Sequence, residues 1–237
     1  MKKRIIAIAL CIAALVTFAV ASAACEEEKT TLQILEENVS CRQTALYTGQ
    51  TENAYVTVGT QDREKVFVAD GVAGEAETFT TVIATLPSMS DESTYSYVLE
   101  GASGKVEGTM KPSVIGAKLV AKIADASALG TFTELTITDS AAPDTPFTFE
   151  LTDEMAEAIE PSKALDLAYG HFKSEIDAEL ASEDGMHREI YVRFVNGKTD
   201  RDSEYYWYVS FVADRGDDMS VLLDPTSGEV VTSRIRP

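Results

Sequence analysis

Apolar and polar side chains alternate through the segment from residue 44 to 151, in short runs that turn residues separate at fairly even spacing. Leu119, Ala121 and Ile123, for example, face away from the lysines on either side of them. A period of two places one face of a strand in a core and the other in water, as in antiparallel sheets packed face to face. The pattern predicts an antiparallel β-sandwich over residues 44–151.

The period changes to that of a helix after an acidic segment at 152–161, which we interpret as a linker. Apolar residues then recur every three or four positions and form one stripe, which consists of Leu165, Ala168, Phe172, Ile176 and Leu180. Such a stripe predicts an amphipathic helix with one side on a core. Ser162 follows Pro161 and is the predicted N-cap.

Three strand-like segments follow the helix, at 189–194, 205–213 and 219–223. A turn at 224–228 leads into a last strand, and Gly228 is predicted to adopt a positive φ where that strand begins. Alternation within 205–213 separates the side chains of the aromatic run. Trp207 and its neighbours at even spacing should pack on the helix. Tyr206 and Tyr208 then lie on the other face, where they either dock on the sandwich or bind a partner.

The C-terminal third, residues 162–237, resembles the PepSY domain. The likeness rests on the amphipathic helix, on the strand Trp207-Tyr208-Val209-Ser210-Phe211, and on the closing sequence from Val221 to Val230, which ends in Asp224-Pro225-Thr226-Ser227-Gly228-Glu229-Val230. The resemblance implies an α+β domain with one helix on an antiparallel sheet, which restrains a peptidase or binds at the cell surface. The expected fold class is therefore a β-rich chain of two domains, the sandwich and this α+β domain.

The first 24 residues have the layout of a secretory signal peptide. Lys2, Lys3 and Arg4 precede an uncharged apolar run, and small residues lead up to Cys25. Cleavage before Cys25 would leave a lipobox-like end with Cys25 as the lipidation candidate, and cleavage after Ala23 would give a secreted chain. An uncleaved segment would act as a membrane anchor. Each alternative predicts an extracytoplasmic location, and residues 25–43 are expected to form a tether or short helix.

The roles of Cys25 and Cys41 depend on how the N-terminal segment is processed. If Cys25 carries a lipid, Cys41 is a lone thiol and is interpreted as a small buried apolar residue. If Cys25 carries no lipid, the two cysteines can form a disulfide outside the cytoplasm. These alternatives stay open at the level of the sequence.

The net charge is −19, and removal of the leader with its three basic residues lowers it to −22. Such a charge repels nucleic acid and anionic lipid headgroups, and it favours cations, basic peptides and solubility. The sequence therefore predicts that nucleic acid is not a partner.

Catalytic and metal-binding patterns are weak. The two histidines are His171, one helical turn before Glu175, and His187. His171 lacks the second histidine of a zinc peptidase motif, so we expect no enzyme, no catalytic residue and no cofactor. Weak Ca²⁺ candidates are Asp200, Asp202, Glu204 and Asp224, which a meander of strands would place at one end of the sheet. The loop lacks the glycine of an EF-hand, so solvated carboxylates are the preferred interpretation and no metal is expected.

The predicted function is that of an extracytoplasmic, lipid-anchored binding protein. Its expected partner is a protein, with an envelope peptidase as the class that the PepSY resemblance implies, and it would contact the membrane through the lipid or the N-terminal segment. The alternative is a surface adhesin or scaffold whose β-sandwich binds a cell-wall or host ligand.

Overall fold

The computed structural model describes residues 29–66, 73–90, 92–183, 185–196, 204–214 and 216–236. The chain divides into two units, Met1–Ile34 and Leu35–Pro237. Of the first unit only residues 29–34 are described, and they include the start of a short helix, α2 (Thr31–Glu37). The predicted signal peptide and Cys25, with its lipid or disulfide, lie outside the described residues.

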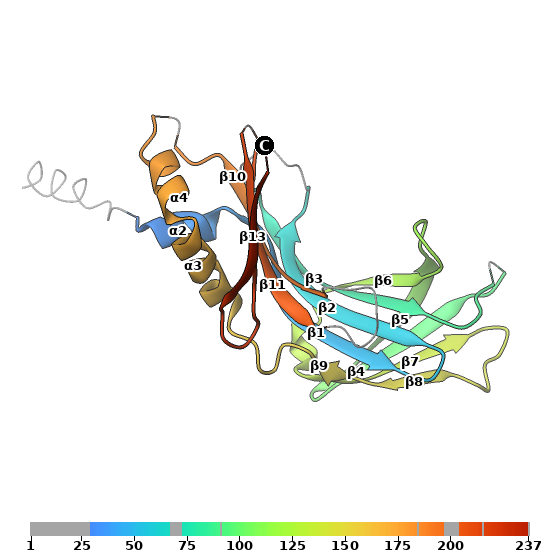
Figure 1. Cartoon of the computed structure of the whole chain (residues 1–237). Coiled ribbons are helices and arrows are strands. Elements are labelled where there is room, and N and C mark those ends of the chain that lie inside the picture. The colour runs from blue at the N-terminus through green and yellow to red at the C-terminus, as the bar shows by residue number, and fades with distance from the viewer. Residues whose placement is uncertain are drawn as a thin grey trace, which may run out of the picture. The chain divides into compact units, whose positions relative to one another are not determined.

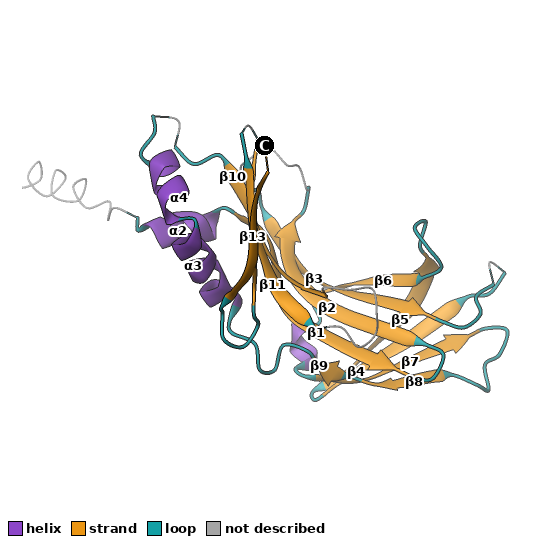
Figure 2. Ribbon diagram, viewed as in Figure 1, coloured by secondary structure: helices purple, strands orange, loops and turns teal. Residues whose placement is uncertain are grey.

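Strands dominate the second unit (Figure 2). Its helices are α3 (Pro161–His171), α4 (Lys173–Leu180) and the 3₁₀ turn η1 (Ser127–Leu129). Its strands are β1 (Val39–Gln50), β2 (Tyr55–Glu64), β3 (Ala76–Thr85), β4 (Tyr95–Gly101), β5 (Gly104–Pro112), β6 (Leu119–Ala124), β7 (Phe132–Asp139), β8 (Phe147–Glu150), β9 (Thr152–Asp153), β10 (Arg188–Asn196), β11 (Tyr205–Ala213), β12 (Asp218–Leu223) and β13 (Val230–Arg236).

The described strands form one mixed sheet of 13 strands in the order β13-β12-β11-β10-β1-β2-β3-β6-β5-β4-β7-β8, with β9 paired to β1 (Figure 1). The predicted fold class, a separate β-sandwich followed by an α+β domain, is therefore wrong. Many of the expected strands are present, but those of the C-terminal third continue the sheet of the first part. The boundaries predicted at 25–43, 44–151, 152–161 and 162–237 stay predictions as domain limits.

The two parts of the sheet meet where β1 pairs with β10 in parallel. Val39 lies opposite Ile190, and the Ile190 N–H donates to the carbonyl of Asn38 at 2.9 Å. The other edge of β1 pairs with β2 in an antiparallel ladder. Strand β1 is therefore a central strand. The short helix expected within residues 25–43 is present as α2, whereas residues 39–43 belong to β1.

Both faces of the sheet are covered at this junction. Consecutive residues Ser40 and Cys41 are buried, and so are Glu189 and Ile190 on β10. Parallel strands are typically buried on both faces, so their residues do not alternate in polarity. The buried carboxylate of Glu189 accepts a hydrogen bond from the hydroxyl of Tyr191. Burial and this carboxylate both raise the pKa of Tyr191, so the hydroxyl stays a donor.

The strands from β1 to β8 curl around one apolar core. Strand β5 pairs with β4 along most of its length and with β6 at Lys111 and Pro112, so the sheet turns a corner there. Tyr47 on β1 meets Phe132 on β7 with ring centroids 5.0 Å apart, although six pairings separate these strands in the sheet order. The alternation predicted for residues 119–123 is confirmed, because Leu119, Ala121 and Ile123 are buried.

Helices α3 and α4 cover one face of the C-terminal strands (Figure 1). The predicted apolar stripe is confirmed for four of its residues, since Leu165, Ala168, Phe172 and Ile176 are buried. Phe172 contacts Phe211 of β11 edge to face at 6.0 Å between centroids. The helix breaks at Phe172, which has non-helical dihedrals, and Ser162 is not the N-cap. Glu160 takes that place because Pro161 already occupies the first helical position, where its missing N–H costs nothing.

The turn from Asp224 to Gly228 packs against α3. Gly228 has a φ of 73°, which confirms the predicted positive value. A Cβ atom at this position would lie 2.4 Å from Leu167 Cδ1 and 3.3 Å from Ile159 Cδ1. Glycine at 228 therefore serves both the backbone conformation and the close approach of the turn to the helix.

Alanine at Gly228 is expected to lower the free energy of unfolding by roughly 2–3 kcal/mol, because left-handed strain adds to displacement of the Leu167 methyl. Gly116 provides a matched control, since its φ is also 73° but no atom lies within 4 Å of the position of a Cβ. Gly116→Ala should cost about 1 kcal/mol from strain alone. Urea denaturation of both variants measures the difference, and equal losses would contradict the close packing of the turn on α3.

Candidate functional site

A groove of about 520 Å³ lies where β11 begins and the turn after β12 reverses the chain. Its residues come from five segments of the chain and combine aromatic rings with carboxylates; they are Glu154, Phe194, Glu204, Tyr205, Tyr206, Asp224, Pro225 and Val231. The antiparallel meander of β10, β11 and β12 places these segments together, because the strand end before Tyr205 and the turn after Leu223 fall at the same end of the sheet.

Stacked aromatic rings form one wall of the groove. Phe194 of β10 and Tyr205 of β11 have ring centroids 5.4 Å apart and planes within 4° of parallel. Phe194 also meets the buried ring of Trp207 edge to face at 5.0 Å. The Tyr205 hydroxyl lies 3.3 Å from that of Tyr55 on β2. The wall is therefore held from both sides and presents a rigid aromatic surface.

Carboxylates surround this wall. The Glu204 carboxylate accepts a hydrogen bond of 2.7 Å from the Tyr206 hydroxyl, and this interaction raises the pKa of the tyrosine. Glu154 accepts a hydrogen bond from the Thr48 hydroxyl, while its N–H donates to the carbonyl of Leu46 at 2.9 Å. The side chain of Glu154 is thus attached to β1, although β9 and α3 lie on either side of it in sequence.

Asp224 orders the turn that closes the groove. Its Oδ1 accepts from the Ser227 N–H at 2.8 Å, from the Ser227 hydroxyl at 2.9 Å and from the Thr226 N–H at 3.1 Å. Hydrogen bonds from Ser227, first from its backbone N–H and then from its hydroxyl, hold the pKa of Asp224 below its usual range. Near neutral pH the carboxylate is ionised, and it organises the turn while adding negative charge to the groove.

The structure brings together some of the predicted site residues. Tyr206, Glu204 and Asp224 all line the groove. Tyr208 does not; it is half-buried further along β11, opposite Arg193 and Leu222 in the ladder. Asp200 and Asp202 lie outside the described residues.

The described residues contain no group of three or more histidine, cysteine or acidic side chains that could hold a metal ion. Within them, the Ca²⁺ candidates contribute only Glu204 and Asp224 to one place. The geometry therefore gives no support to the weak Ca²⁺ hypothesis.

Sequence reasoning missed Glu154, Phe194, Tyr205 and Val231. Phe194 lies in the predicted strand 189–194, where nothing local marks it as part of a site. Glu154 stood in the predicted linker, where nothing local indicates its bond to Thr48 of β1. The one sequence feature that pointed to the groove was the aromatic run at 205–208. Its first two residues, Tyr205 and Tyr206, lie on opposite faces of the strand and both line the groove.

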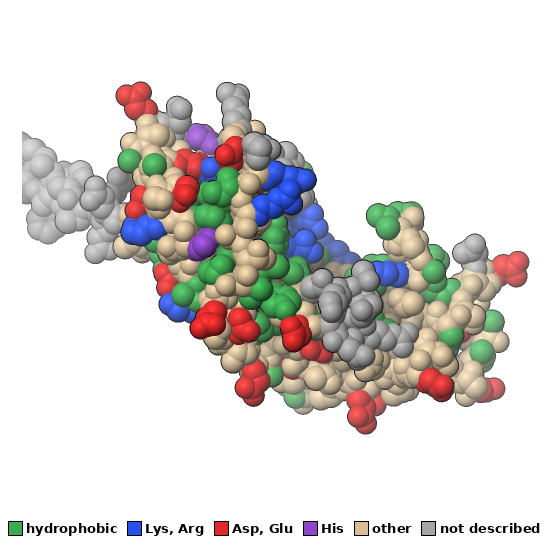
Figure 3. All heavy atoms as spheres, in the orientation of Figure 1, with side chains coloured by type: hydrophobic (Ala, Val, Ile, Leu, Met, Phe, Trp, Pro, Cys, Tyr) green, Lys and Arg blue, Asp and Glu red, His purple; other side chains and the backbone are tan. Residues whose placement is uncertain are grey.

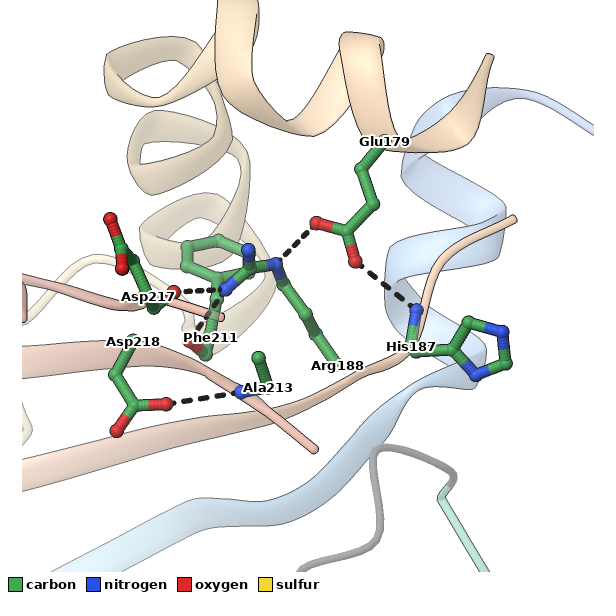
Figure 4. Close-up of polar contacts among 7 residues, drawn as sticks. All are labelled: Glu179, His187, Arg188, Phe211, Ala213, Asp217 and Asp218. Atoms are coloured by element: carbon green, nitrogen blue, oxygen red, sulfur yellow. Dashed lines mark hydrogen bonds and ion pairs between the residues drawn. The ribbon is translucent and has the colours of Figure 1, made fainter. Parts of the chain in front are cut away.

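The opposite end of β10 carries a structural network around Arg188 (Figure 4). Its Nε donates to Glu179 of α4 at 2.5 Å, and its Nη1 donates to the carbonyls of Asp217 at 2.7 Å and Phe211 at 3.4 Å. His187 contributes only its backbone N–H, which donates to Glu179 at 3.2 Å, and its ring points away in Figure 4. The network attaches α4 to the sheet.

The other candidate reactive groups occupy structural positions. His171 is exposed at the end of α3, and its ring lies 4.7 Å from that of Phe172. Cys41 is buried and its Sγ lies 3.6 Å from Oε1 of Gln61, as expected for a small buried residue. Burial raises the pKa of the Cys41 thiol, which keeps it in the unreactive neutral form.

Comparisons with protein-family models, with curated proteins and with solved structures find no match to this chain. The resemblance of residues 162–237 to the PepSY domain therefore has no support beyond the sequence features quoted for it, and it stays a prediction. No helix within the described ranges is long and apolar enough to span a membrane.

Proposed function

We infer that this chain is an exported binding protein and that the groove beside β11 holds a basic segment of a protein partner. The observation that carries the proposal is the combination, in one groove, of a stacked aromatic wall with the carboxylates of Glu154, Glu204 and Asp224. Guanidinium and ammonium groups bind to aromatic faces and to carboxylates, so a basic side chain satisfies both features of the groove at once.

The charge of the whole chain supports this choice of ligand. A net charge of −19 for the full sequence raises the local concentration of cationic segments and speeds their association. Export is proposed from the leader-like first 24 residues. An envelope peptidase is the partner class that the PepSY resemblance implies, and the groove adds the requirement that the partner present an arginine or lysine in an exposed segment.

Calorimetric titration with two synthetic peptides tests the proposal. One is a ten-residue peptide of alternating arginine and glycine, and the other has glutamate in place of each arginine. The basic peptide is expected to bind and the acidic peptide to give no heat of binding. Glu204→Gln, which keeps the side-chain shape and removes its charge, should weaken binding roughly three- to tenfold.

Two further variants separate the groove from general charge. Glu107→Gln removes an exposed carboxylate of β5, away from the groove, and should leave the affinity unchanged. Tyr205→Ala removes one of the two stacked rings of the aromatic wall and should weaken binding about as much as Glu204→Gln. Equal losses for Glu107→Gln and Glu204→Gln would show that net charge alone attracts the peptide, and the groove would then have no specific role.

A further inference from the structure

The hairpin between β5 and β6 carries two large apolar side chains in solvent. Val114 is 100% exposed and Ile115 is 81% exposed. The hairpin projects beyond the strands that flank it in Figure 1, and Figure 3 shows hydrophobic side chains at the end of this projection. Neither side chain contributes to the core that β1 to β8 enclose. Exposure of two adjacent aliphatic side chains to water is unfavourable, and burial against another surface would recover that hydrophobic free energy.

The turn holds these side chains outward. The Ser113 N–H donates to the carbonyl of Lys118 at 2.8 Å, which closes the hairpin. The Ser113 hydroxyl donates to the carbonyl of Ile115 and accepts from its N–H, both at 3.1 Å. Gly116 completes the turn with a positive φ. Because these hydrogen bonds already order the backbone of the tip, its transfer from water to an apolar environment costs little backbone conformational entropy.

Basic residues flank the apolar tip. Lys111 and Lys118 are both exposed at its base, and neither forms an ion pair within the part of the chain that the structure describes. At physiological salt the Debye length is about 8 Å, so the charges nearest the tip contribute most there. Residues 111–118 include these two lysines and no acidic residue. The tip is therefore locally basic although the chain is acidic.

We propose that this hairpin inserts Val114 and Ile115 into an anionic lipid bilayer while Lys111 and Lys118 contact the headgroups. Apolar side chains at the boundary of the acyl region, with lysines at the level of the phosphates, are the arrangement through which peripheral proteins bind membranes. A protein partner is a poorer fit, because two side chains on a narrow turn cover far less than the roughly 800 Å² per partner of a stable interface.

The contact is weak by itself and adds to any other attachment of the chain to the same membrane. It does not depend on the groove, which other strands form. Binding of a basic peptide and insertion of the hairpin are therefore separate properties, and each can fail without the other.

Quenching by lipids with brominated acyl chains tests the insertion. The full chain is mixed with vesicles of phosphatidylcholine, with or without phosphatidylglycerol, and an indole is introduced by Ile115→Trp. Trp207 is fully buried and supplies a constant background. In vesicles that contain phosphatidylglycerol, the emission of the introduced indole should fall about twofold relative to unbrominated lipid. Val66→Trp, at an exposed site on another loop, should show no quenching.

Two additional variants make the test specific. Val114→Asp combined with Ile115→Trp should abolish quenching, because a carboxylate at the tip cannot enter the acyl region. Lys111→Gln with Lys118→Gln should reduce quenching in the anionic vesicles. Absence of quenching for Ile115→Trp, equal quenching for Val66→Trp, or equal quenching in neutral and anionic vesicles would each overturn the proposal. The first of these outcomes would leave the tip to a protein partner.

Discussion

Replacing Trp207 with alanine is expected to lower the free energy of unfolding by about 3–5 kcal/mol. The indole is completely buried between the sheet and α3, and the Phe194 ring packs on it. Its Nε1–H donates to the carbonyl of Ile159 at 3.1 Å. Alanine would leave a cavity and would also remove the donor from this carbonyl. Urea denaturation monitored by circular dichroism measures the loss of free energy. Fluorescence is unsuitable because the substitution removes the single tryptophan of the chain.

Two controls separate the contributions to this effect. Trp207→Phe keeps most of the apolar volume and loses the hydrogen bond, so its cost should be clearly smaller than that of alanine. Tyr208→Ala changes the next residue, which is half-buried on the other face of β11, and should also cost less. A loss of less than about 1 kcal/mol for Trp207→Ala would contradict the packing of β11 against α3.

Leu135→Ala, far from Trp207 in the sheet order, is expected to shift the unfolding midpoint that Trp207 fluorescence reports. Leu135 is completely buried in the core that β1 to β8 enclose, so its truncation should cost about 2–5 kcal/mol. Because β1 belongs to the pairings of both parts, the sheet should unfold as one cooperative unit. Trp207 fluorescence and circular dichroism should therefore move together to the same lower urea concentration.

Thr133→Ala is the matched control, since Thr133 is exposed on the same strand. This substitution should change the free energy of unfolding by no more than about 0.5 kcal/mol. If Leu135→Ala leaves the fluorescence midpoint unchanged while circular dichroism shows an earlier transition, the two parts unfold separately. That outcome would contradict the role of the β1–β10 pairing in joining the two parts into one cooperative unit.

Local patterns predict local structure well in this chain. The alternation at Leu119, Ala121 and Ile123 identified a buried face, and the helical stripe identified four buried residues, Leu165, Ala168, Phe172 and Ile176. The turn chemistry at Asp224 and Gly228 was also readable, because backbone strain and side-chain acceptors act within a few residues. These features depend on neighbours in sequence, so a single sequence contains the information.

Pairing between distant strands is different. Ser40 and Glu189 are polar but buried, so their polarity gives no sign that both faces of β1 and β10 are covered where these strands pair. Nothing near Val39 indicates that Ile190 lies beside it. The sequence therefore suggested two modules where the structure has one sheet.

The candidate site was predicted only in part for the same reason. Glu204 and Asp224 were identifiable because a meander fixes which turns share an end of the sheet, and Tyr206 because alternation along its strand separates it from Trp207. Glu154 joins them through its hydrogen bond to Thr48, and Phe194 through its stack on Tyr205. Both contacts connect segments that only the tertiary structure brings together.

The parallel contact between Val39 and Ile190 also constrains the order of events in folding. About 150 residues separate these partners, and closing so long a loop makes folding slow relative to a chain of local hairpins. Until β10 arrives, β1 presents an unpaired edge to which another chain can add. The newly made polypeptide thus passes through an aggregation-prone interval that ends only when its last third has emerged and docked.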